Sequence, residues 1–146
     1  MEILKAYLDF AIFGILGIMG FIALWVTIER SLFYRSISFN NYEHAVLLNV
    51  ALTRNLTALS IIGSNAPFVG LLGTVIGILI TFYDMGQNQS LDTGAIMIGL
   101  ALALKATAAG IGIAIPTIIA YSGLVRKVDV LNSLYHSKTQ TSSSNP

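Results

Sequence analysis

The sequence predicts an all-α membrane protein with three transmembrane helices. The chain of 146 residues is 55% hydrophobic and only 10% charged, and its mean hydropathy is +0.76. Soluble domains carry about 25% charged residues, so this chain has too few charges to cover a surface that faces water. Three apolar stretches, at residues 10–28, 56–83 and 93–125, are each long enough to cross a bilayer, which takes about 20 residues.

The same composition excludes several classes of function. Too little chain remains outside the apolar stretches for a soluble catalytic domain, so we expect a protein that is not an enzyme. The absence of cysteine excludes thiolate metal sites and thiol chemistry, and we expect no cofactor and no metal. A net charge of +1 offers no basic surface to a nucleic acid. The expected surroundings are a lipid bilayer.

The first transmembrane helix is predicted over residues 10–30, after a short N-terminal segment at 1–9. The 19 residues from 10 to 28 carry no charge. A signal peptide is the alternative, but it would need a basic start and a small-residue cleavage site. Because Glu2 and Asp9 offset Lys5 at the start, we interpret the stretch as a retained helix.

Residues 31–55 are predicted to form a cytoplasmic loop that contains an amphipathic helix. Asn40 and Glu43 have the spacing of a capping box. Apolar residues then recur at helical spacing and lead into the second apolar stretch: Ala45, Leu48, Leu52, Leu56 and Leu59. This pattern predicts a helix that continues without a break. His44 has no second ligand at metal spacing, so we interpret it as a solvated surface histidine.

The second transmembrane helix is predicted over residues 56–83, with a short polar periplasmic loop at 84–93. Pro67 is expected to bend or restart this helix. Three glycines near one face are expected to pack closely against another helix: Gly70, Gly73 and Gly77.

The third transmembrane helix is predicted over residues 94–125, with a cytoplasmic tail at 126–146. Small residues that allow close helix packing, including Ala106 and Gly110, fill its middle. Pro116 is expected to kink the helix. At about 1.5 Å per residue, the second and third helices exceed a hydrocarbon core of about 30 Å, so we expect both to extend into the cytoplasm. The Ser/Thr-rich end of the tail is expected to be disordered.

Basic residues are distributed unequally between the two ends of the predicted helices. Counted from Glu29 to Asn55, the first loop holds three Lys or Arg residues, and the C-terminal tail holds another three, whereas only Lys5 lies on the opposite side. The positive-inside rule therefore places the first loop and the tail in the cytoplasm and the N-terminus outside.

Polar residues within the second and third apolar stretches are the candidates for function. A threonine in a membrane helix commonly bonds back to its own helix, and this alternative stays open for Thr74. Lys105 lies about 200° around the helix from Thr107, so we expect it between helices or between subunits. A structural ion pair or a side chain that snorkels to an interface is the alternative for Lys105.

The apolar stretches contain no Asp, Glu or His away from their ends. Proton relays across a membrane usually depend on these residues. Threonine hydroxyls donate and accept hydrogen bonds, but they do not hold a proton in transit at neutral pH. If protons cross the membrane here, the group that carries them must come from another chain.

Two long motifs in the second and third stretches carry a family resemblance. APFVGLLGTVIGILITF begins at Ala66, and ALKATAAGIGIAIPTIIAY begins at Ala103. Both resemble the ExbB/TolQ/MotA family of proton-channel subunits, and its ExbB branch in particular. The resemblance implies a homo-oligomer, a pentamer in this family's pattern, in the bacterial inner membrane. Its pore would hold an ExbD-like one-span protein that supplies an aspartate. A TonB-like protein would pass the work to TonB-dependent outer-membrane transport.

The resemblance also implies roles for individual residues. Thr74 and Thr107 match the pore-lining threonines of the family. One position departs from the pattern, because Leu102 stands where better-known members have a glutamate, and Lys105 follows one turn later. A scheme in which this subunit supplies its own titrating carboxylate in the third helix is therefore in doubt.

Three other functions are alternatives to that of a channel subunit. A TolQ-like subunit of the Tol-Pal envelope-maintenance system would carry the same motifs. A structural membrane scaffold without ion flow is a further alternative, and only the paired threonines and the family motifs favour a channel subunit over it. A small multidrug-type antiporter needs an acid embedded in the membrane, which the apolar stretches do not contain.

Overall fold

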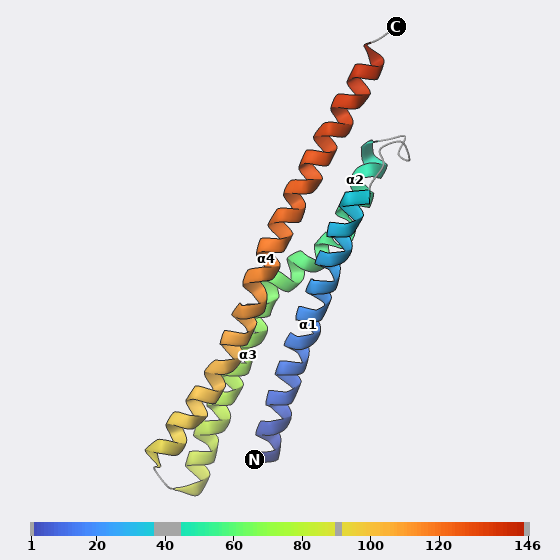
Figure 1. Cartoon of the computed structure of the whole chain (residues 1–146). Helices are drawn as coiled ribbons and strands as arrows, with labels where there is room; N and C mark the ends of the chain where they lie inside the picture. The colour runs from blue at the N-terminus through green and yellow to red at the C-terminus, as the bar shows by residue number, and fades with distance from the viewer. Residues whose placement is uncertain (1, 37–44, 90–91, 145–146) are drawn as a thin grey trace.

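The computed structural model describes residues 2–36, 45–89 and 92–144, and helices account for nearly all of them (Figure 1). The helices are α1 (Glu2–Ser36), α2 (Ala45–Thr53), α3 (Leu56–Asn88) and α4 (Thr93–Ser143). Three of them, α1, α3 and α4, are long and apolar enough to cross a membrane. For the described residues, the predicted all-α fold with three helices able to span a bilayer is confirmed.

The three long helices run side by side, and α3 is antiparallel to α1 and α4 (Figure 1). The start of α1 lies at the same end of the molecule as the end of α3 and the start of α4. The end of α4 and the short helix α2 lie at the other end. One buried cluster joins α1, α3 and α4 near their middle and consists of Ile12, Leu16, Ala66, Ala106 and Ala114. A second cluster lies nearer α2 and includes Leu48, Leu52, Leu59, Leu124 and Val128.

The first and last helices are longer than the sequence predicted. α1 begins at Glu2, so residues 2–9 continue the first helix and do not form a separate segment. α4 runs to Ser143 and so includes most of the tail expected to be disordered. In this part of α4, Ser and Thr hydroxyls bond to the preceding turn of the same helix. The hydroxyl of Thr139, for example, donates to the carbonyl oxygen of Tyr135 at 3.0 Å.

α2 and α3 are separate helices, which corrects the prediction of one helix without a break. α2 ends at Thr53 and α3 begins at Leu56. Between them, Asn55 has a φ of 65°, in the left-handed region. A residue there cannot continue a right-handed helix, and Asn adopts this conformation more readily than most residues. The expected capping box and His44 lie outside the described residues.

Both prolines within the long helices are accommodated in continuous helix. α3 runs through Pro67 and ends at Asn88, so the first half of the expected loop at 84–93 is helical. α4 runs through Pro116. Figure 1 shows a change of direction within the green part of α3, whereas α4 stays nearly straight in this view. Of the two expected kinks, only the one in α3 is therefore visible.

Candidate functional site

The backbones of α3 and α4 approach each other closely at two glycines. A Cβ atom added at Gly70 would lie 2.5 Å from the carbonyl oxygen of Ala106, and one added at Gly110 would lie 2.5 Å from that of Ala66. Real Cβ atoms do not approach backbone oxygen so closely, because the atoms would overlap. Glycine at both positions is thus what allows the two helices to touch, as their small-residue motifs predicted.

The same contact continues towards the end where α3 meets the start of α4. A Cβ added at Gly73 would lie 2.7 Å from Cβ of Ala106, and one added at Gly77 would lie 2.8 Å from Cβ of Ala103. The two helices therefore keep a fixed register over several turns. That register decides which polar side chains on α3 meet which on α4.

Within this close contact, the hydroxyl groups of Thr74 and Thr107 are hydrogen-bonded to each other. Thr74 is only 7% exposed, and Thr107 is half-buried. The Thr74 hydroxyl also lies 3.0 Å from the carbonyl oxygen of Ala103 on the other helix and 3.3 Å from that of Gly70 on its own helix. The structure thus brings together the two threonines that the sequence singled out.

The number of available protons limits how the Thr74–Thr107 pair can bond. Each hydroxyl has one proton to donate and two lone pairs that accept. If Thr107 donates to Thr74, then Thr74 donates to the carbonyl oxygen of Ala103, its shortest carbonyl contact at 3.0 Å. Thr107 then has a lone pair left to accept a bond. If Thr74 donates to Thr107 instead, Thr107 is free to donate, and the nearest carbonyl oxygen, that of Gly70, is 3.5 Å away.

Two other buried threonines show what a purely local bond looks like. The hydroxyl of Thr81 donates to the carbonyl oxygen of Gly77 at 2.9 Å, and that of Thr117 donates to the carbonyl oxygen of Ile113 at 2.7 Å. Both are ordinary bonds to the preceding turn of the same helix. Thr74 differs because it also bonds across to α4.

Lys105 does not join the threonine pair. Its side chain is exposed, and among the residues that the structure describes no acidic group forms an ion pair with it. Leu102, which stands where the resembling family has a glutamate, is 42% exposed.

Leu102 lines a hollow between α1, α3 and α4, with a volume of about 580 Å³. The same hollow is lined by the charged residues Lys5, Asp9, Asp84 and Asp92 and by Thr81 and Gly99. Thr81 lies seven positions, or about 10 Å along the helix, from Thr74. The hollow therefore reaches within about two turns of the threonine pair.

Sequence reasoning missed a polar cluster at the other end of α1. Arg30 is buried, with 3% of its surface exposed. It donates to the carbonyl oxygen of Ala51 at 3.1 Å and to the carboxylate of Glu29 at 2.7 Å. The hydroxyl of Tyr34 donates to the carbonyl oxygen of Leu52. These bonds satisfy carbonyl groups in the last turn of α2, because the last carbonyl groups of a helix have no N–H partner within the helix.

The only sequence signal for this cluster was a charged pair at the end of the first apolar stretch. Glu29 and Arg30 end the stretch predicted as the first transmembrane helix, 10–30, and that position gives no sign of a cap for another helix. The carboxylate of Glu29 also accepts from the side-chain amide of Asn55 at 3.3 Å. The cluster thus joins the end of α1 to the break between α2 and α3.

Comparison with known proteins finds close relatives of the whole chain. The MotA/TolQ/ExbB proton channel family matches residues 41–137. A protein of Helicobacter pylori named "Biopolymer transport protein ExbB" is 53% identical over 135 residues, which cover 92% of this chain and 93% of the relative. A protein of the same name from Aquifex aeolicus is 51% identical over 128 residues, covering 88% and 86% of the two chains. A "Putative biopolymer transport protein ExbB-like 2" of Helicobacter pylori is 43% identical over 143 residues, covering 96% and 95%. The matched region includes the glycine contact and the threonine pair.

Proposed function

Because the chain belongs to the MotA/TolQ/ExbB proton channel family, we propose that it is a channel-forming subunit that energises TonB-dependent outer-membrane transport with the proton-motive force. The names of its relatives support the ExbB branch of the family, since two of them, at 51–53% identity, are called biopolymer transport protein ExbB. In this proposal the protein is a multi-pass protein of the bacterial inner membrane. It works as a homo-oligomer, a pentamer by analogy with the family.

The observation that carries the proposal is the bonded pair of Thr74 and Thr107 at the α3–α4 contact. A carboxyl group beside Thr107 could be held in both of its protonation states. The protonated acid would donate to the free lone pair of Thr107, while Thr107 donates to Thr74. The carboxylate would accept from Thr107 after the hydroxyl protons have turned the other way. The pair therefore suits a carboxyl group that gains and loses a proton, and only hydroxyl rotation is required.

That carboxyl group must come from a partner. No residue of α3 between 56 and 83, and none of α4 between 94 and 125, is acidic. Asp9, Asp84 and Asp92 line the hollow, and none of these three carboxylates is hydrogen-bonded to Thr74 or Thr107. An ExbD-like protein with one membrane span and an aspartate inside it has the chemistry that is needed. A TonB-like protein would then receive the work done by the proton.

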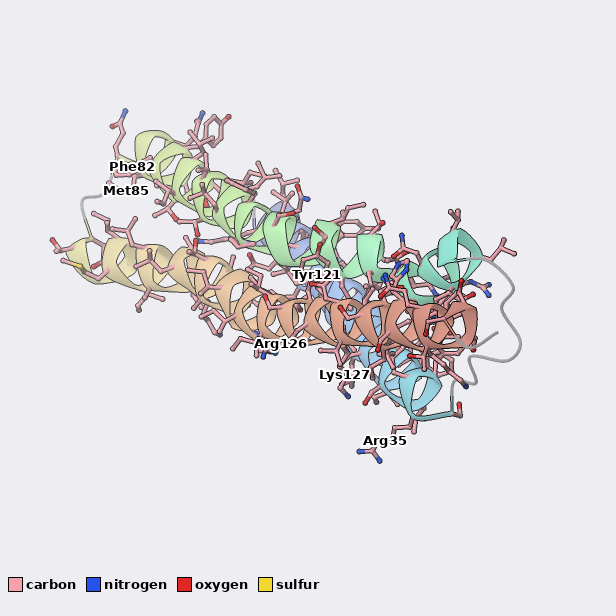
Figure 2. All side chains as sticks on the ribbon, turned by 90° about the horizontal axis from the view of Figure 1, so that it is seen from above. Arg35, Phe82, Met85, Tyr121, Arg126 and Lys127 are labelled. Atoms are coloured by element: carbon pink, nitrogen blue, oxygen red, sulfur yellow. The ribbon has the colours of Figure 1, made fainter. Side chains whose placement is uncertain are left out.

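The charges at the two ends support an orientation. Figure 2 shows the side chains of Arg35, Arg126 and Lys127 lying away from Phe82 and Met85, which mark the end of α3. In the proposal, the basic end faces the cytoplasm. The hollow with its three aspartates then opens on the outer side, from which protons enter.

The test uses a strain that lacks its own copy of this subunit and depends on a plasmid-borne copy for TonB-dependent uptake. Thr74→Val and Thr107→Val remove the hydroxyls and keep the side-chain size. We expect both variants to assemble normally and to lose uptake. Thr117→Val is the matched control, because Thr117 is also buried but bonds only to its own helix. Full uptake with both Thr74→Val and Thr107→Val would show that the pair does not serve transport.

A further inference from the structure

The contacts of α1 fix its height relative to α4. A Cβ added at Gly73 would lie 2.7 Å from Ala106 on α4 and 3.0 Å from Ile12 on α1, so Ile12 and Ala106 lie at the same level. One added at Gly20 would lie 3.6 Å from Ile113. The residue number on α4 is 94 higher than that on α1 for Ile12 and Ala106, and 93 higher for Gly20 and Ile113. α1 and α4 are therefore parallel with a constant offset.

This offset places Asp9 at the height of positions 102 and 103 of α4. The hollow agrees, because Asp9 and Leu102 both line it. Lys105 is then only two or three positions further along, or about 3–5 Å in height. The sequence assigned Asp9 to a short segment outside the membrane and Lys105 to the middle of a helix. In the structure the two charges lie at nearly the same depth.

No other carboxylate of the described chain lies so near the height of Lys105. Asp92 is 13 positions before it on the same helix, which is about 20 Å. On α3, Gly77 lies beside Ala103, which places Asp84 about ten positions, or roughly 15 Å, from the height of Lys105. Glu29 lies towards the opposite end of α1. Asp9 alone is within one helical turn.

Both charges are exposed and do not form an ion pair with each other within one chain. A charged side chain at membrane depth is costly unless it is paired or hydrated. The face of α4 that carries Lys105 also carries small, exposed residues, with Ala101 one turn before it, Ala108 one turn after it and Gly112 two turns after it. Nothing lies within 4 Å of a Cβ added at Gly112. This face is therefore open to a helix that approaches closely.

α1 has a small residue on the side next to Asp9. Gly17 lies about 80° around the helix from Asp9 and has nothing within 4 Å of an added Cβ. With the same offset, it lies at the height of positions 110 and 111 of α4, near Gly112. Copies of one chain that stand side by side in the same orientation keep these heights. Small residues then face small residues, and opposite charges come to the same level.

We propose that Lys105 of one copy forms an ion pair with Asp9 of the neighbouring copy, where α1 of the neighbour packs on the Lys105 face of α4. The inference rests on the proposed function in one respect, since it requires the homo-oligomer. It adds which faces meet and which charges are paired. Lys105 is then a residue of the subunit interface, and the N-terminal part of α1 belongs to that interface.

Cysteine cross-linking tests the pairing directly, because the natural chain has no cysteine. Asp9→Cys and Lys105→Cys are placed on two separately tagged copies that are expressed together. We expect oxidation to yield a cross-linked dimer that carries both tags. The matched control replaces Asp9→Cys with Ala11→Cys. Ala11 is exposed and lies at nearly the same height, but it points about 160° away around the helix. It should give much less cross-linked product.

The possible outcomes distinguish a failure of the ion pair from a failure of the proposed function. An intact oligomer without a cross-link between Asp9→Cys and Lys105→Cys would overturn the pairing and leave the proposed function standing. A disulfide formed only within a single chain that carries both cysteines would overturn it as well. If native mass spectrometry finds only monomers of the unmodified protein, the homo-oligomer fails and the proposed function fails with it.

A double-mutant cycle provides a second measurement that does not depend on oxidation. Asp9→Asn and Lys105→Gln should each lower the temperature at which the detergent-solubilised oligomer dissociates. The double variant should dissociate at about the same temperature as either single variant, because one ion pair has been removed in all three. Lys5→Gln combined with Lys105→Gln is the control, since Lys5 also lines the hollow but cannot pair with a cation. Additive effects of Asp9→Asn and Lys105→Gln would contradict the pairing.

Discussion

Gly70 and Gly110 face each other across the contact of α3 with α4, so that a Cβ atom added to either would lie 3.1 Å from Cα of the other. The glycines themselves bear no chemistry. They bring the backbones close enough for Thr74 to bond to Thr107 and to the carbonyl oxygen of Ala103. The candidate site thus depends on the absence of side chains at two glycines that lie about one turn away from the hydroxyl groups.

Gly70→Ala should destabilise the protein and weaken transport together. The new methyl group would meet a backbone oxygen at 2.5 Å, which no side-chain rotation can relieve, so the helices must move apart. Overpacking of this kind costs about 1–3 kcal/mol. Thermal denaturation in detergent measures the first effect and TonB-dependent uptake the second. Gly86→Ala is the control, because nothing lies within 4 Å of a Cβ added there. Equal stability of the two variants would contradict the expected clash.

Thr107→Ser should keep most of the uptake that Thr107→Val loses. Serine preserves the hydroxyl that bonds to Thr74, whereas valine removes it, so that the buried hydroxyl of Thr74 loses its bond to residue 107. A hydrogen bond of this kind contributes about 0.5–1.5 kcal/mol to stability, so neither change should unfold the protein. Uptake rates normalised to the amount of subunit in the membrane separate the two variants. If serine and valine were equally inactive, the methyl group and not the hydroxyl would be what matters.

Arg30→Met should loosen the junction of α2 with α3 and leave the glycine contact intact. The substitution removes the bonds to Ala51 and Glu29 but keeps a long side chain. Hydrogen bonds from a charged group are worth about 1.5–3 kcal/mol. We expect faster hydrogen exchange in α2 and unchanged exchange around Gly70. Arg35→Met, at an exposed position, should change neither. Uniformly faster exchange along the chain would mean that Arg30 supports the whole fold.

Asn55→Ala should be more destabilising than Asn55→Gly. The left-handed φ of 65° at this position costs a residue with a Cβ atom about 1–2 kcal/mol, and glycine avoids that cost. Both variants lose the amide bond to Glu29, so their comparison isolates the backbone effect. Thermal denaturation measures the difference. Higher stability of the alanine variant would indicate that the break between α2 and α3 closes into one helix.

The class of the protein and the positions of its unusual motifs could be inferred from the chain alone. Three long apolar stretches leave a bilayer as the only suitable surroundings, because hydrophobicity over about 20 residues is a local property of the chain. The glycines, the threonines and Lys105 could likewise be identified as unusual from their neighbours alone.

The sequence was less informative where local preferences compete. Helical periodicity continued across Asn55, so the break there could not be foreseen. It is fixed by the left-handed backbone at this residue and by the bond from Asn55 to Glu29, 26 positions away. The Ser/Thr-rich end of α4 was expected to lack structure on composition. In the structure, hydroxyls such as that of Thr139 bond to the helix itself.

Which residues share a height could be learned only from the packing of the helices. The way the helices are shifted along one another determines three relationships. Thr74 meets Thr107, Arg30 caps α2, and Asp9 lies at the height of Lys105. The shift is set by contacts such as Gly70 with Gly110 and Gly73 with Ile12 and Ala106. Helical periodicity gives the direction of a side chain around its own axis, but it contains no information about the height of a neighbouring helix, because that height depends on atoms far away in the sequence.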